Sequence, residues 1–258
     1  MALSKAKIKF LASLKQKKFR EIENRFLIEG EKILSECIHS DWEIIEVFLS
    51  NEVVKKNSQF VELIKGKKIP ITIIPAKEFE KFSSDKTPSQ IAALVERKQF
   101  LEDEVFNLSS KKFLILQNIS DPGNFGTIIR SADWFGINGI ICDESTVELT
   151  NPKVVKGSMG SIFHLLILHN VHLLSFCEKL KSSGMKIIST STTGKDLSQF
   201  DFSENCAVIF GNESVGISEQ INKIADETIA IPKFGKAESL NVSIAASIIL
   251  YEWTRKFS

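Results

Sequence analysis

The chain has 258 residues, of which 43% are hydrophobic and 25% are charged, and its formal net charge is +1. These values are typical of a soluble globular protein of about two domains. No apolar run reaches the roughly 18 residues that a membrane span needs, and the basic first 20 residues lack the apolar core of a secretory signal.

The chain begins with a basic segment. Residues 1–20 contain seven lysines and arginines and no acid. Such a segment can neutralise RNA phosphates, although the solvated face of a helix gives the same pattern. The residues that we expect to contact RNA are Lys5, Lys15, Lys17, Lys18 and Arg20.

The first half of the chain alternates short apolar runs with stretches of helical spacing. We expect strands at 26–28, 43–49, 69–74 and 91–95, and helices at 31–38, 60–64 and 77–82. This alternation predicts a small α/β domain over residues 1–98. The polar and acidic stretch that follows predicts a linker at 99–111.

The second half, residues 112–258, contains five short apolar runs, several of which show no polar alternation. They lie at 113–116, 137–142, 165–168, 185–189 and 207–210, with helical stretches at 125–135 and 173–181. Such runs are expected in a parallel sheet that helices cover on both faces. The pattern therefore predicts a doubly wound α/β domain, whose ligand binds at the carboxyl ends of the strands.

One polar segment connects the first of these strands to a helix. Asp121 before Pro122 is typical of a helix cap with proline in the first turn, and Asn124 is the other candidate cap. Arg130 lies farther along this helix, away from its apolar stripe. A fixed guanidinium there could grip a phosphate with two hydrogen bonds. A surface arginine paired with Asp133 would give the same pattern.

A second segment follows the apolar run 207–210. Gly211 and Gly216 allow tight turns and a close approach of the backbone to a ligand. A plain turn into a helix capped by Ser218 is the alternative. The segment lacks the glycine spacing of phosphate-binding loops.

A third segment precedes a C-terminal helix that is apolar on nearly every side. A helix of this kind is buried by more than one neighbour, and the domain core together with a dimer contact would supply that burial. Ser239 and Asn241 lie at its beginning, where N–H groups are unpaired. Ser239 could function in a site or simply cap the helix.

In this order the three segments resemble the SpoU (TrmH) family of RNA ribose 2′-O-methyltransferases, which belongs to the SPOUT superfamily. The matching residues are 121–132 (DPGNFGTIIRSA), 211–213 (GNE) and 238–243 (ESLNVS). Looser matches at 25–30 and 91–96 resemble the RNA substrate-binding domain of that family. The resemblance implies a small N-terminal ribosomal-protein-like α/β domain and a C-terminal doubly wound domain with a trefoil knot.

The resemblance also implies a cofactor, S-adenosylmethionine, held in the knot by backbone around Thr190, Gly211, Ile231 and Leu240. The stretch that contains Thr190 matches the family only loosely. The resemblance further implies a homodimer whose knot regions pack together. No metal is required, because the sulfonium of the cofactor already activates its methyl group. The four cysteines are far apart and form no metal-binding cluster, which fits a reducing cytoplasm.

Carried over by position, Arg130 is the main catalytic candidate. Asn124 would position Arg130 or the target nucleotide, and Glu213, Ser239 and Asn241 would complete the pocket. Because an arginine stays protonated, either a phosphate of the target helps to take the proton, or Arg130 orients the ribose and stabilises the alkoxide.

The implied activity is transfer of a methyl group to a ribose 2′-hydroxyl of structured RNA. The additional N-terminal domain could read structured RNA by its shape, which favours ribosomal RNA over transfer RNA. Three alternatives are a transfer-RNA ribose methyltransferase, an inactive RNA-binding protein of the same fold, and a knotted enzyme that methylates a base. Presence of all five polar candidates argues against an inactive protein.

Overall fold

The computed structural model describes residues 2–108, 111–203 and 205–256. Its contacts divide the chain into two compact units. The first unit combines Met1–Lys98 with Glu148–Phe163, and the second combines Gln99–Val147 with His164–Ser258. The segment Glu148–Phe163 thus lies in the sequence range expected for the methyltransferase domain, yet it belongs to the first unit.

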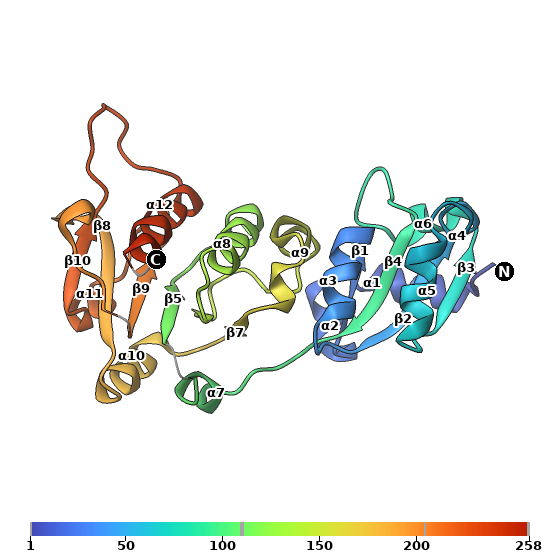
Figure 1. Cartoon of the computed structure of the whole chain (residues 1–258), viewed down its shortest axis with the longest axis horizontal. Coiled ribbons are helices and arrows are strands. Elements are labelled where there is room, and N and C mark those ends of the chain that lie inside the picture. The colour runs from blue at the N-terminus through green and yellow to red at the C-terminus, as the bar shows by residue number, and fades with distance from the viewer. Residues whose placement is uncertain (1, 109–110, 204, 257–258) are drawn as a thin grey trace. The chain divides into compact units, whose positions relative to one another are not determined.

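The first unit contains a mixed four-stranded sheet (Figure 1). β4 is antiparallel to both β1 and β2, and β2 is parallel to β3. The four predicted strands of the first half are confirmed. In sheet order they are β1 (Arg25–Glu29), β4 (Ile91–Glu96), β2 (Ile44–Ser50) and β3 (Ile71–Ile74).

Helices of the first unit include the three that were predicted and several that were not. The predicted ones are α3 (Glu31–His39), α5 (Ser58–Gly66) and α6 (Ala76–Phe82). The others are α1 (Lys5–Ser13), α2 (Lys17–Glu23), α4 (Asn51–Lys56), α9 (Pro152–Ser158) and the 3-10 turn η1 (Ser161–Phe163). Lysines occupy much of α1 and α2, so the sequence shows little apolar periodicity there.

The prediction that Arg20 contacts RNA is wrong. Its side chain is 2% exposed, and its guanidinium makes a two-pronged ion pair with the Glu148 carboxylate, with Nε at 3.0 Å from Oε1. Its Nη1 also donates to the backbone oxygens of Leu14 and Lys15, at 2.8 Å each. The sequence could not show this, because the partner carboxylate lies 128 residues away.

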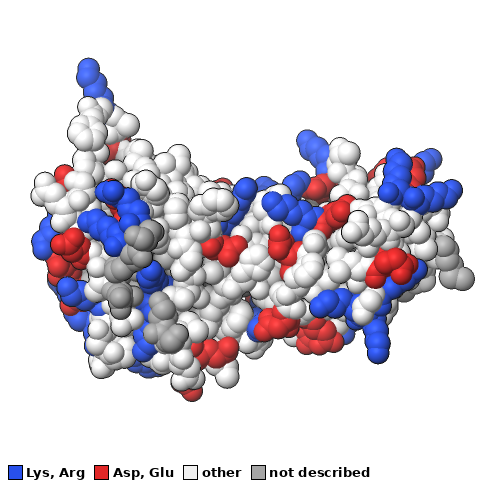
Figure 2. Space-filling view, in the orientation of Figure 1, with Lys and Arg blue, Asp and Glu red and all other residues white. Residues whose placement is uncertain are grey.

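The other four basic candidates are exposed. They are Lys5 in α1, Lys15 between the first two helices, and Lys17 and Lys18 in α2. Lys17 lies 3.7 Å from Glu21 on its own helix. On the face shown in Figure 2, basic and acidic side chains are interspersed, in keeping with the net charge of +1.

The second unit is built on a six-stranded sheet whose strands are all parallel, as predicted. In sheet order the strands are β10 (Glu227–Ala230), β8 (Lys186–Asp196), β9 (Cys206–Phe210), β5 (Lys112–Leu116), β6 (Gly139–Cys142) and β7 (Leu166–Leu168). The strand order runs outward from β5 in one direction through β6 and β7. The later strands lie on the other side of β5, which creates the switch point at which doubly wound folds bind ligands.

Helices flank this sheet. α10 and α11 share a buried core with Phe113, Ile187 and Ile209, whereas α8 and α12 pack against each other through a hydroxyl pair, Ser131 and Ser247, 2.8 Å apart. The helices are α7 (Glu102–Phe106), α8 (Pro122–Trp134), α10 (Leu173–Ser182), α11 (Glu219–Ile224) and α12 (Val242–Arg255), with a 3-10 turn η2 (Leu197–Gln199). Of the helices in the described ranges, none is long and apolar enough to cross a membrane.

Three details differ from the sequence-based expectation. β10 was not predicted, and β8 extends well beyond the predicted 185–189. The expected linker contains α7, whose Val105 is buried against the core of the second unit. Of the two candidate caps of α8, Asp121 is the one that the structure confirms, because its Oδ1 accepts the backbone N–H of Asn124 at 2.8 Å.

Candidate active site

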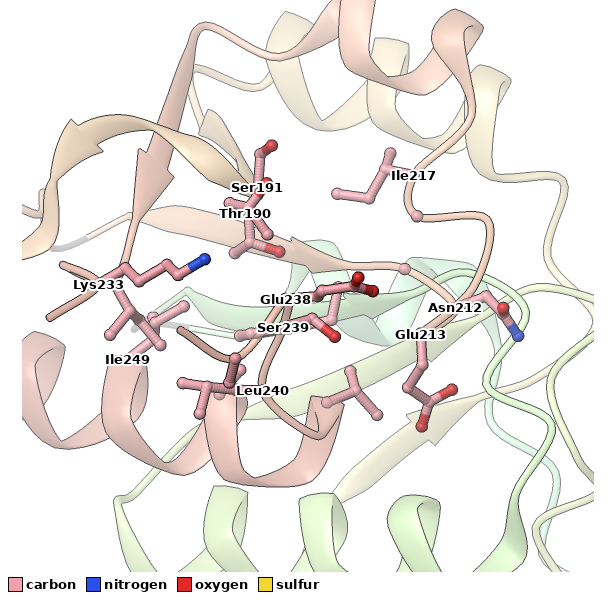
Figure 3. Close-up of a pocket in the computed structure, with 18 of the residues that line it drawn as sticks. Thr190, Ser191, Asn212, Glu213, Ile217, Lys233, Glu238, Ser239, Leu240 and Ile249 are labelled. Atoms are coloured by element: carbon pink, nitrogen blue, oxygen red, sulfur yellow. The ribbon is translucent and has the colours of Figure 1, made fainter. Parts of the chain in front are cut away.

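A cavity of about 620 Å³ lies at the carboxyl ends of β9 and β10, beside the middle of β8 and the beginning of α12 (Figure 3). A volume of this size is in the range of cofactor sites. The four residues predicted to hold the cofactor all line it: Thr190, Gly211, Ile231 and Leu240. The carboxyl ends of the parallel strands therefore bring together residues that are 50 positions apart in the sequence.

The loop after β9 forms one wall of the cavity and is held tightly. A Cβ atom on Gly211 would lie 2.4 Å from the carbonyl carbon and oxygen of Gly216, so any side chain there would force the loop to move. Gly216 has φ of +73°, a conformation that glycine adopts without strain. Its N–H donates to the backbone oxygen of Asn212 at 2.8 Å, which closes the turn.

Asn212 fixes this loop to the rest of the sheet. Its Oδ1 accepts the backbone N–H groups of Ser214 at 2.9 Å and Val215 at 3.2 Å. Its Nδ2 donates to the backbone oxygen of Asn118, in the loop after β5, at 3.0 Å. The sequence analysis did not select Asn212, although it lies between Gly211 and Glu213 in the segment that carries the resemblance.

A polar network joins three of the predicted catalytic residues. Asn124, in the first turn of α8, donates through Nδ2 to the Glu213 carboxylate. Its Oδ1 accepts from Asn241 Nδ2 at 3.0 Å and from Ser243 Oγ at 3.5 Å. Because both ends of its amide are engaged, Asn124 is held in one orientation.

The helix that follows the third segment is capped by Asn241 and not by Ser239. Asn241 Oδ1 accepts the backbone N–H groups of Ser243 at 2.9 Å and Ile244 at 3.4 Å. Ser239 is exposed and lines the cavity. The hydroxyl of Ser239 is therefore not used to start α12.

Ser218 likewise does not cap its helix, contrary to the expected turn. No backbone N–H of α11 donates to the Ser218 side chain. Its Oγ accepts instead from Gln117 Nε2 at 3.0 Å, and its own N–H donates to Gln117 Oε1 at 2.8 Å. These two hydrogen bonds connect the end of the loop after β9 to the carboxyl end of β5.

Arg130 is the predicted catalytic residue that the structure does not bring into this cavity. It is exposed on α8, on the side of the helix that carries Thr127 and Trp134, and it does not line the pocket. Within the described ranges Arg130 makes no hydrogen bond or ion pair. Asp133, its expected alternative partner, is instead 2.9 Å from His164 Nδ1.

The residues present fit S-adenosylmethionine. The cavity wall contains two carboxylates, Glu213 and Glu238, and one ammonium group, Lys233. At neutral pH the cofactor carries a sulfonium, an ammonium and a carboxylate, so the charges are complementary in sign. Among the residues that the structure describes, no group of three or more histidine, cysteine or acidic side chains is placed to hold a metal ion.

Comparison with known families assigns both parts of the chain. The family model described as SpoU rRNA Methylase family matches residues 111–251. The model described as MRM3-like substrate binding domain matches residues 5–93. The RNA-binding part and the methyltransferase part expected from the sequence are therefore both recognised.

Individual proteins resemble the chain along most of its length. The 23S rRNA (guanosine(2553)-2′-O)-methyltransferase RlmP of Bacillus subtilis (strain 168) is 31% identical over 246 residues, covering 95% of this chain and 94% of that protein. The AdoMet-bound rRNA methyltransferase from Sinorhizobium meliloti superposes with a TM-score of 0.88 at 25% identity, covering 100% of this chain and 97% of the other.

A shorter structure matches only part of the chain. The TrmH/SpoU tRNA modifying enzyme of A. aeolicus has a TM-score of 0.52 at 30% identity and covers 60% of this chain and 80% of its own. Together with the cavity at the strand ends, these likenesses identify the chain as a member of the SpoU rRNA methylase family of S-adenosylmethionine-dependent RNA 2′-O-methyltransferases.

Proposed function

We propose that this chain transfers a methyl group from S-adenosylmethionine to a ribose 2′-hydroxyl of ribosomal RNA. The observation that carries the proposal is the cavity whose wall contains all four expected cofactor contacts and also Glu213, a member of the Asn124 network. A cofactor site and a cluster of fixed polar side chains are thus combined at one edge of the sheet.

The cofactor would be held by backbone around Thr190 within β8 and just after the ends of β9 and β10. Gly211 keeps the cavity wall in its position, because a Cβ there would collide with the Gly216 backbone and push the loop away. Apolar side chains of Ile231 and Leu240 line the same cavity and can cover the less polar parts of the cofactor. When bound, S-adenosylmethionine supplies a methyl group that its sulfonium has already activated.

The chain's own residues must place the ribose hydroxyl and assist loss of its proton. Asn124 is held by Glu213 and Asn241, so it offers a rigid support for the target nucleotide. Ser239 lies in the cavity wall with its side chain exposed. We assign to Arg130 the binding of a target phosphate and the stabilisation of the developing alkoxide, since its guanidinium stays charged.

An apolar surface next to Arg130 supports a homodimer. Trp134 of α8 is 83% exposed, and Ile244 and Tyr251 of α12 are 52% and 57% exposed. These side chains belong to two helices that pack against each other. Exposed apolar side chains that gather on adjacent elements are typical of an interface, and we propose that a second copy of the chain covers them.

Two further expectations stay proposals. The loops after β9 and β10 both line the cavity, and we propose that they form the trefoil knot implied by the resemblance.

The four cysteines are free and buried, and burial raises the pKa of Cys37 to about 12 and that of Cys177 to about 11. Thiols kept protonated and buried suit a reducing cytoplasm, which we propose as the location.

Coverage of the relatives supports ribosomal RNA over transfer RNA. The likeness to the 23S rRNA enzyme extends over 95% of the chain and therefore includes the N-terminal domain. The likeness to the tRNA modifying enzyme covers 60%. The extra domain and its exposed lysines Lys5, Lys15, Lys17 and Lys18 offer contacts to a large structured RNA.

The test is to incubate the purified protein with S-adenosylmethionine and ribosomal RNA or transfer RNA from a strain that lacks the gene. Nucleoside mass spectrometry should then detect a 2′-O-methylnucleoside in ribosomal RNA only. Methylation of transfer RNA or of a base would contradict the proposal. Absence of transfer to either RNA would favour an inactive RNA-binding protein, and titration calorimetry with S-adenosylmethionine would then show whether the cavity binds the cofactor.

A further inference from the structure

The loop between β10 and α12 carries an exposed aromatic side chain flanked by lysines. We propose that this loop is an RNA contact in which Phe234 stacks on an unpaired base of the substrate while Lys233 and Lys236 neutralise its phosphates. The inference rests on the proposed methylation of RNA and names the residues that would hold the strand beside the cavity.

Phe234 is 97% exposed, more than any other large apolar side chain in the described part of the chain. The loop that carries it projects from the second unit between β10 and α12 (Figure 1). A phenylalanine in this position contributes almost nothing to the core. A single exposed apolar residue is common on protein surfaces, so a functional role for Phe234 depends on the residues around it.

Those neighbours are basic. Lys233 and Lys236 are both exposed, and neither forms an ion pair with another described residue. Figure 2 shows basic side chains at the end of the projecting loop. In Figure 3 the amino group of Lys233 points toward the cavity and not away from it. Ammonium groups that flank an exposed aromatic residue in the sequence are a combination by which proteins hold single-stranded nucleic acid.

The position of the loop determines which part of the RNA it would meet. The same ten residues supply Ile231, Lys233, Phe234 and Leu240 to the cavity wall, so the loop borders the expected cofactor site. A base stacked on Phe234 therefore belongs to a nucleotide close to the one whose ribose enters the site. Although Phe234 lines this cavity, 97% of its side chain is exposed, so its loss should weaken substrate binding and leave the cofactor in place.

The experiment measures steady-state methylation of ribosomal RNA from a gene-deleted strain by four variants. These are Phe234→Ala, Phe234→Tyr, the double variant Lys233→Ala/Lys236→Ala, and Lys186→Ala as a control. Lys186 is exposed at the amino end of β8, the end of the sheet opposite the cavity. The Kd for S-adenosylmethionine and the oligomeric state of each variant are measured in parallel.

Phe234→Ala should raise the KM for RNA about 5- to 100-fold, the effect of losing one base–aromatic stack. The kcat and the Kd for S-adenosylmethionine should not change, and Phe234→Tyr should behave as the wild type. The double lysine variant should reduce the slope of log KM against log salt concentration by about 1.4, or roughly 0.7 for each lost phosphate contact on a single strand. Phe234→Ala and Lys186→Ala should keep the wild-type slope.

An unchanged KM in Phe234→Ala would overturn the proposal. Weaker binding of S-adenosylmethionine would place Phe234 against the cofactor, and a changed oligomeric state would place it against a second copy, so either result overturns it as well. Failure of the proposed function would be recognised by a different result, which is that the wild-type protein transfers no methyl group to ribosomal RNA. In that case direct binding of the same RNA to wild type and Phe234→Ala decides the contact, and equal affinities overturn it.

Discussion

Asn241 caps α12 with its side-chain oxygen and, through the nitrogen of the same amide, donates a hydrogen bond to Asn124 Oδ1 at 3.0 Å. One side chain thus begins a helix and fixes a residue of the proposed catalytic network 117 positions away. The two roles use different atoms, so substitutions can separate them.

Asn241→Asp should keep the protein stable but slow methyl transfer. The carboxylate can still accept the N–H groups of Ser243 and Ile244, and negative charge is favourable at a helix N-terminus. It cannot donate to Asn124, which must lose this contact or turn its amide away from Glu213. We expect a fall in kcat on the order of 10²-fold and a free energy of unfolding within about 0.5 kcal/mol of the wild type.

Asn241→Ala is the matched variant, because it removes both contacts. It should also lose about 1 kcal/mol of stability through the missing cap. Urea unfolding and single-turnover methylation measure the two effects. Full turnover by Asn241→Asp would show that the contact to Asn124 is not needed.

Gly211→Ala should weaken binding of the cofactor. The added Cβ would lie 2.4 Å from the Gly216 carbonyl group, so the loop after β9 must shift away from its position at the cavity. Titration calorimetry should show at least a roughly tenfold higher Kd for S-adenosylmethionine, since even small displacements of a built site are costly. Gly235→Ala is the control: it changes a glycine that lines the same cavity, and its Cβ would meet nothing within 4 Å. Equal Kd values for the two variants would disprove the tight contact.

Arg130→Ala should abolish most turnover without affecting cofactor affinity. Arg130 lies outside the cavity wall, but its charge is assigned to the target phosphate and the alkoxide. Loss of one electrostatic contact in a transition state typically costs about 10²- to 10³-fold in kcat. Arg130→Lys keeps the charge but loses the two-pronged geometry, so its kcat should lie between that of Arg130→Ala and that of the wild type. Wild-type turnover by a folded Arg130→Ala protein would remove Arg130 from the mechanism.

The buried pair Arg20–Glu148 should make stability depend on pH. Burial raises the pKa of the Glu148 carboxyl, but hydrogen bonds from Arg20 and Thr150 and the charges of Arg20 and Arg97 outweigh burial and lower it below its usual value. A carboxyl whose pKa is lowered in the folded state stabilises the protein at neutral pH. That contribution disappears as the pH falls through the lowered pKa.

Arg20→Met leaves the Glu148 carboxylate buried without its main partner and should cost about 3–5 kcal/mol in the free energy of unfolding at pH 7. The deficit should shrink as the pH falls, because the unpaired buried carboxyl of the variant takes up a proton at a higher pH than the paired carboxyl of the wild type. Arg20→Met/Glu148→Gln should recover part of the loss, because it removes the unpaired charge. A deficit that is the same at pH 7 and pH 3.5 would show that the charge of Glu148 is not its cause.

The exposed lysines at the N-terminus should contribute to RNA affinity through charge alone. Replacing Lys5, Lys15, Lys17 and Lys18 by alanine should weaken RNA binding and lower its salt dependence, while the Kd for S-adenosylmethionine stays the same. Filter binding at several salt concentrations measures both quantities. If the quadruple variant keeps the wild-type salt slope, these lysines do not contact phosphates.

Individual elements show which parts of the structure could be predicted from the sequence. The strands at 113–116 and 207–210 were visible because a parallel sheet covered on both faces requires unbroken apolar runs. Asp121 was identified as a cap because proline follows it at the first helical position. The short strand β10 was missed, since its four residues Glu227–Ala230 contain too few apolar positions to show a period.

The sequence by itself determined the parallel sheet, the beginning of α8 and the residues of the three segments, since these depend on the local order of side chains. Only the tertiary structure decided that Arg20 is buried against Glu148, that Asn241 and not Ser239 caps α12, and that Arg130 does not line the cavity. Burial and hydrogen-bond partners depend on contacts between residues up to 128 positions apart. Local sequence patterns do not specify such contacts.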